Sequence, residues 1–112
     1  MTDPASLAEI IATYEKHGWV LRRVLLSNAA RTALGPMTDS LSAKVPVMDS
    51  DIDAAWFSRP PKSGGVAWEI RYLGQTPFAL LENIDESNGD LEARLSAVEE
   101  RLRASVAAKK PA

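Results

Sequence analysis

Cysteine is absent from this chain of 112 residues, and histidine occurs only once. Without cysteine the chain forms no disulfide, thiolate zinc site, iron–sulfur cluster or cysteine nucleophile. A zinc site would have to rely on carboxylates, which is uncommon, so we expect no metal and no cofactor. The absence of cysteine and of a secretory signal predicts a cytoplasmic protein. The alanine-rich composition suggests a bacterial source.

An excess of basic charge and a long apolar run are missing as well. Lys and Arg number 13 against 15 Asp and Glu, for a formal net charge of −2. Nucleic-acid-binding domains are usually basic, so a nucleic-acid partner is not expected. No apolar run approaches the roughly 18–20 residues that span a membrane, so we expect no membrane partner.

What the chain does contain is enough apolar material for one folded domain. Apolar residues make up 46% of the sequence, which excludes a chain that is disordered throughout. The length favours a single domain, which we place at residues 1–108. Residues 109–112 are predicted to form a frayed C-terminal tail.

The first segment has the pattern of an amphipathic helix, which we predict over residues 4–17. Asp3 is a suitable N-cap, and Pro4 fits the first helical position. Gly18 can end the helix in the left-handed conformation, and His17 would then lie beside the free C-terminal carbonyls, where a cation is favoured. The apolar side chains recur at the spacing of one helical face: Leu7, Ile10, Ile11 and Tyr14.

A strand is predicted over residues 19–27. This segment is rich in β-forming residues, is apolar on both faces and carries Arg22 and Arg23 in its middle. Because neither face is polar throughout, the pattern favours a central or half-covered strand.

The middle of the chain has the weakest pattern. Residues 28–50 contain a turn signal at Gly35–Pro36. Lys44–Met48 could form a short strand, which the proline inside it would restrict to a sheet edge. Residues 51–58 fit either a helical turn or a strand.

The clearest pattern is a hairpin. Residues 66–73 alternate with a period of two, and residues 78–84 follow as a second strand. A two-residue loop at Gly74–Gln75 would bring Pro77 into the ladder, whereas an odd-numbered loop gathers the apolar side chains on one face. The odd loop therefore predicts these pairs: Tyr72 with Phe78, Ile70 with Leu80, and Val66 with Ile84.

The last element is predicted as a helix over about residues 89–107. Ser87 and Asp90 have the spacing of a capping box. The apolar stripe covers only two heptads, which favours packing on the chain's own sheet over a coiled coil: Leu91, Leu95, Val98 and Leu102. These elements predict an α+β fold, with a small antiparallel sheet of three to five strands and the N-terminal and C-terminal helices packed on one face.

Two short motifs resemble ligand loops and fail on their spacing. Asp49–Asp53 begins like a calcium loop, but the sixth position is Ala54 and the twelfth is Pro60. Lys62–Gly65 lacks the earlier glycine and the following helix of a phosphate-binding loop. We therefore interpret the first as a solvated turn and the second as an inter-strand loop.

The leading functional hypothesis is a non-enzymatic interaction or regulatory module, and no residue pattern points to an enzyme. If two helices cover one sheet face, the other face exposes apolar side chains, which usually mark an interface. We expect that face to bind a second copy, giving a homodimer, or another protein. Its predicted contact residues are Glu69, Arg71, Leu73 and Leu81.

The alternative hypothesis is a small-molecule pocket between the helices and the sheet, lined by aromatic side chains. Its predicted residues are Arg22, Arg23, Trp56, Trp68, Tyr72 and Glu82. The register puts Glu82 on the apolar face opposite Trp68, where an isolated carboxylate would have a raised pKa. The simpler interpretation is that Glu82 lies at a sheet margin or pairs with Arg22 or Arg23.

Overall fold

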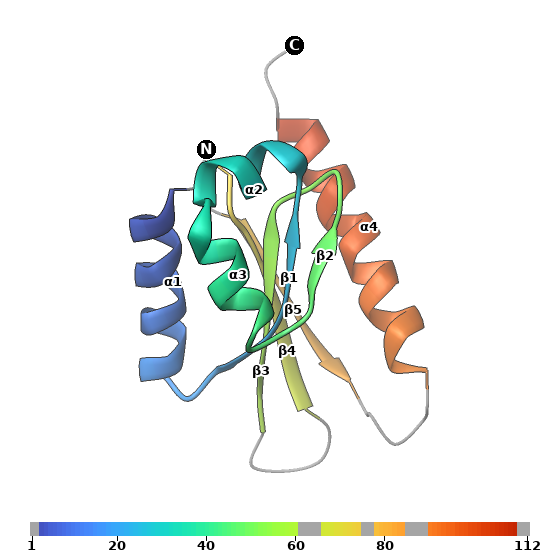
Figure 1. Cartoon of the computed structure of the whole chain (residues 1–112). Coiled ribbons are helices and arrows are strands. Elements are labelled where there is room, and N and C mark those ends of the chain that lie inside the picture. The colour runs from blue at the N-terminus through green and yellow to red at the C-terminus, as the bar shows by residue number, and fades with distance from the viewer. Residues whose placement is uncertain (1–2, 61–65, 75–77, 85–89, 110–112) are drawn as a thin grey trace.

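The computed structural model describes residues 3–60, 66–74, 78–84 and 90–109. Within these ranges four helices flank one five-stranded sheet (Figure 1). In chain order the elements are α1 (Pro4–Lys16), β1 (Val20–Leu26), α2 (Asn28–Leu34), α3 (Pro36–Ser42), β2 (Val47–Asp49), β3 (Ala54–Arg59), β4 (Val66–Tyr72), β5 (Phe78–Ile84) and α4 (Leu91–Lys109).

The strands lie in the order β2-β1-β3-β4-β5. Three of the four pairings are antiparallel, and only β1 and β2 run parallel. The α+β class and the expected strand number are therefore confirmed, although the sheet is mixed where a purely antiparallel one was expected. The parallel pair arises because α2 and α3 carry the chain across from the end of β1 back to the start of β2, as a parallel connection requires.

The prediction that both terminal helices pack on one face is wrong. The leucine and valine side chains of α4 join Trp56 in one core, whereas Leu7 of α1 joins Phe57 in another. Consecutive residues of a strand point to opposite faces, so these two cores lie on opposite sides of β3. Figure 1 shows the sheet between α4 on one side and α1 and α3 on the other. The first five residues of β3 are all buried, so both faces of this strand need a cover.

The N-terminal helix begins at the predicted residue and ends at Lys16, one residue before the predicted end. The side chain of Asp3 accepts a hydrogen bond from the backbone N–H of Ser6, and Pro4 is the first helical residue. His17 is the C-cap, and Gly18 follows with a φ of 88°, a conformation that strongly favours glycine. The chain can therefore turn directly from α1 into β1.

The middle segment contains two helices that the sequence pattern did not reveal. The hydroxyl of Ser27 caps α2 by accepting from the N–H of Ala30 at 3.2 Å. Gly35, with a φ of 57°, separates α2 from α3, at the turn predicted for Gly35–Pro36. The expected short edge strand is confirmed, but it begins one residue after Pro46. Residues 51–58, where the pattern was ambiguous, contain most of β3.

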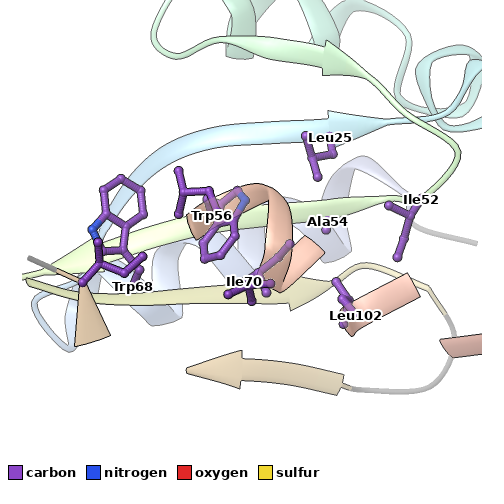
Figure 2. Close-up of a cluster of buried hydrophobic side chains, with 10 residues drawn as sticks. Leu25, Ile52, Ala54, Trp56, Trp68, Ile70 and Leu102 are labelled. Carbon is purple, nitrogen blue, oxygen red and sulfur yellow. The ribbon is translucent and has the colours of Figure 1, made fainter. Parts of the chain in front are cut away.

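The hairpin has the register predicted from the alternation. Tyr72 stands opposite Phe78, and Val66 stands opposite Ile84. The predicted capping role of Ser87 and the predicted loop at Lys62–Gly65 lie outside the described residues. On the α4 side, the hairpin and β3 contribute the cluster of buried side chains in Figure 2, which includes Trp56 and Trp68.

Candidate functional site

The two edges of the sheet differ in length and protection. The β2 edge is three residues long, and a proline immediately precedes it in the turn. The β5 edge is seven residues long and contains no proline, lysine or arginine. Short length, proline and lysine are usual means of blocking an edge strand, and β5 has none of them. Its one charged residue, Glu82, is paired with Arg94 and Arg101 of α4.

Beside this edge the sheet face on the α1 side is incompletely covered. Leu81, in the middle of β5, is 61% exposed and is the most exposed large apolar residue among those whose burial is described. We call the β4 and β5 side chains around it the open strip; its members are Ala67, Glu69, Arg71, Ala79, Leu81 and Asn83. Three of the four predicted interface residues belong to this strip, namely Glu69, Arg71 and Leu81.

Leu73 was expected to be exposed on the same face, but in the structure it is buried. Its side chain is only 3% exposed and packs in the core beneath α1. Leu73 follows β4, and its backbone N–H donates to the carbonyl oxygen of Asp53 at 2.8 Å, which continues the pairing with the neighbouring chain segment. The exposed surface therefore ends before this residue.

Tyr14 of α1 closes the inner border of the open strip. Its ring stacks on Phe57 at a centroid distance of 4.0 Å, and its hydroxyl donates to the carboxylate of Glu69. Burial, followed by the hydrogen bond to Glu69, raises the pKa of the Tyr14 phenol. Next to this contact lies a hollow of about 340 Å³, to which Arg71 and several α1 residues contribute.

Arg22 and Arg23, which were predicted to belong to the pocket, lie together on the α4 face of the sheet. The register of β1 against β3 shifts between Leu21 and Arg23, which is a β-bulge. Leu21 packs in the α1-side core, whereas Arg22 contacts Trp68 and Arg23 contacts Glu92, both on the α4 side. A bulge therefore directs two consecutive side chains to one face.

The two arginines have different partners. Arg23 donates to both carboxylate oxygens of Glu92 at 3.1 and 2.7 Å, and these hydrogen bonds lower the pKa of Glu92. Arg22 lies over the ring of Trp68, 5.1 Å from its centroid, and donates to Ser58 Oγ at 3.3 Å. In the described residues, no carboxylate forms an ion pair with Arg22.

The predicted pocket aromatics are core residues. Trp56 and Trp68 are 0% and 2% exposed and meet edge to face at 5.9 Å. Trp56 Nε1 donates to Glu99 of α4 at 2.7 Å, whereas Trp68 Nε1 has no partner among the described residues. Figure 2 shows the Trp68 nitrogen on the side of the ring turned away from Trp56.

The remaining two predicted pocket residues lie elsewhere. Glu82 stands opposite Trp68, but it forms ion pairs with Arg101 at 3.1 Å and Arg94 at 3.7 Å, both on α4. It therefore has arginine partners, as the simpler interpretation expected, although they are not Arg22 or Arg23. Tyr72 lines a hollow of about 420 Å³ beside Arg103, among side chains that follow β2 or belong to the end of α4.

The acidic segment that begins at the last residue of β2 has carboxylates with separate partners. Asp49 pairs with Arg31 at 2.9 Å, and Asp51 pairs with Arg103 at 2.7 Å. Asp53 accepts from the backbone N–H of Ser27 at 2.7 Å. Within the described ranges, no group of three or more potential ligands is placed to hold a metal ion.

Comparisons with known families, with characterised proteins and with solved structures give no match. Of the helices that the structure describes, none combines the length and the apolar character needed to cross a membrane. Geometry and charge indicate two candidate sites among the described residues. They are the β5 edge with its open strip, and the arginine–tryptophan contact on the α4 face.

Proposed function

We propose that this protein is a cytoplasmic interaction module that forms a homodimer by pairing its β5 edge with the β5 edge of a second copy. The observation that carries this proposal is the seven-residue β5 edge, which contains no proline or lysine and has at its centre a leucine that is 61% exposed. An exposed edge strand presents unpaired backbone N–H and C=O groups that can add another strand.

A second copy is a suitable occupant because β5 is compatible with itself. In an antiparallel pair around a two-fold axis at its middle residue, Leu81 stands opposite Leu81 of the second copy. On the α4 face Glu82 would stand opposite Leu80, so no like charges meet directly. Arg94 and Arg101 of the same chain already partner Glu82.

The open strip adds apolar contact to this backbone pairing. Leu81 would lose its contact with water, and the small side chain of Ala79 beside it allows close approach. Leucine burial is worth about 1.5–3 kcal/mol for a side chain that starts fully exposed, and a symmetric dimer gains this contribution twice. Pairing would also join the two five-stranded sheets into one continuous sheet.

The test is the molar mass in solution by light scattering at micromolar concentration. We expect the wild-type chain to have twice its 12.2 kDa chain mass. Leu81→Lys should return it to the chain mass, because lysine on an edge strand opposes pairing. Met48→Lys is the matched control, since Met48 is 42% exposed on the opposite edge strand, and it should leave the dimer intact.

Two outcomes contradict the proposal. One is a wild-type chain that remains a 12.2 kDa monomer. The other is a folded Leu81→Lys variant that dimerises as tightly as the wild type, which would place any interface away from β5. Circular dichroism of each variant verifies that the fold is retained.

A further inference from the structure

We propose that Arg22, Ser58 and Trp68 form a binding site for a carboxylate on the α4 face of the sheet. These three residues belong to β1, β3 and β4, and they bring a guanidinium, a hydroxyl and an indole N–H together. The proposal does not depend on dimer formation, because the site lies on the opposite face from the open strip.

The sheet register brings the two neutral donors side by side. Ser58 stands directly opposite Trp68 in the β3–β4 pairing. Both side chains are buried, at 4% and 2% exposure, and Ser58 is the one buried polar residue among those described. Directly opposite residues of an antiparallel pair have Cβ atoms about 4.5–5.5 Å apart, and the Arg22 guanidinium contacts both side chains.

These donors lack acceptors among the described residues. Trp68 Nε1 is buried without any hydrogen-bond partner. The described partner of Ser58 Oγ is Arg22, which donates to it, so the hydroxyl proton of Ser58 remains available. A buried donor without an acceptor costs about 1–3 kcal/mol, and an oxyanion could accept from both groups.

The positive charge of this cluster favours an anion as its ligand. Arg23 is neutralised by Glu92, but Arg22 has no such partner within the described ranges. The 3.3 Å hydrogen bond from Arg22 to Ser58 is longer than the usual 2.9–3.0 Å, so a better acceptor could replace it. Arg22 is also the exposed member of the three, which leaves its charge accessible from solvent.

A carboxylate matches this arrangement. It carries one negative charge against the single unpaired guanidinium, and its two oxygens can accept from the planar fork of arginine. The same oxygens provide further lone pairs for Ser58 and Trp68. Both a free carboxylic acid and the C-terminus of a peptide present this group.

The test uses the three indole N–H signals of the chain in a nitrogen–proton correlation spectrum. Tryptophan-to-phenylalanine variants assign the signals, and sodium acetate is titrated against sodium chloride at equal ionic strength. We expect the Trp68 signal to shift saturably with acetate only. A tripeptide with a free C-terminus, compared with its amide, separates a peptide ligand from a free acid.

The chain contains a matched control for the arginine. Arg59 lies 4.6 Å from the ring centroid of Trp19, which repeats the Arg22–Trp68 contact on another part of the molecule. Arg22→Gln should weaken acetate binding by about tenfold or more, whereas Arg59→Gln should not change it. Ser58→Ala should weaken binding as well, which provides a second variant if the first one misfolds.

Three results would overturn the site. The Trp68 signal could stay fixed up to high acetate concentration, or it could shift equally with chloride. Binding could also persist unchanged in a folded Arg22→Gln variant. A shift that saturates at a lower concentration of the free tripeptide than of acetate, and that is absent with the tripeptide amide, would support a peptide carboxylate as the ligand.

Discussion

The hydrogen bond between Trp56 and Glu99 attaches α4 to the centre of the sheet, and its removal should have a measurable cost. Trp56 Nε1 donates to Glu99 Oε2 at 2.7 Å from a side chain that is 0% exposed. In Glu99→Ala the buried indole N–H would lose its acceptor. A hydrogen bond to a charged group contributes about 1.5–3 kcal/mol to stability. We therefore expect the free energy of unfolding to fall by about 2 kcal/mol and Tm to fall by about 10 °C.

Urea denaturation of a double-mutant cycle isolates this contribution. In a Trp56→Phe background the donor is absent, so Glu99→Ala should cost less than about 0.5 kcal/mol there. Glu100→Ala is the matched control, because Glu100 is an exposed neighbour whose described partner is Arg103, three residues along α4. It should change stability by less than about 1 kcal/mol. Equal costs of Glu99→Ala in both backgrounds would refute the reasoning.

Two further predictions concern the pH dependence of stability. The hydrogen bonds from Arg23 lower the pKa of Glu92, so the unfolded chain binds the proton at a higher pH than the folded one. The free energy of unfolding should therefore decrease as pH falls below about 4.3, and Glu92→Gln should flatten this decrease in urea titrations. Burial and the contact with Glu69 raise the pKa of Tyr14, so its phenol ionises first in the unfolded chain. Stability should therefore decrease above about pH 10, and Tyr14→Phe should reduce that loss; unchanged curves for the two variants would contradict these assignments.

The parts of the fold that could be predicted are those specified by local signals. Asp3, Pro4 and Gly18 mark the ends of α1 because each satisfies a requirement of the helix termini themselves. The alternation of residues 66–73 sets the register of β4 on β5, because a slip of one residue would turn the apolar side chains to the other face.

The placement of the helices could not be predicted in the same way. The segment Ala54–Ser58 is buried throughout, and a strand covered on both faces shows no alternation that would reveal which helix covers which side. The helices α2 and α3 have seven residues each, which is too short for a helical period to stand out.

The candidate sites, like the fold, could be predicted only where a local sequence pattern specifies them. The exposure of Leu81 followed from its place in the alternation, whereas Arg22 and Arg23 share a face only because of a bulge in the β1–β3 pairing. A bulge depends on the opposing strand and has no signal in the local sequence. The roles of Ser58 and Glu99 were missed because they depend on which strand neighbours Trp68 and on how α4 is rotated over the sheet.

The most direct test of pairing through β5 is disulfide formation by a Leu81→Cys variant. The chain has no cysteine, so this substitution introduces a single thiol. In the proposed pair the two copies of residue 81 stand opposite each other, with Cα atoms about 4.5–5.5 Å apart, within the usual range for a disulfide. Mild oxidation should give a covalent dimer of Leu81→Cys on a non-reducing gel. The Met48→Cys variant should form no covalent dimer and should run at the mass of a single chain. Slow, equal cross-linking of both variants would contradict the pairing.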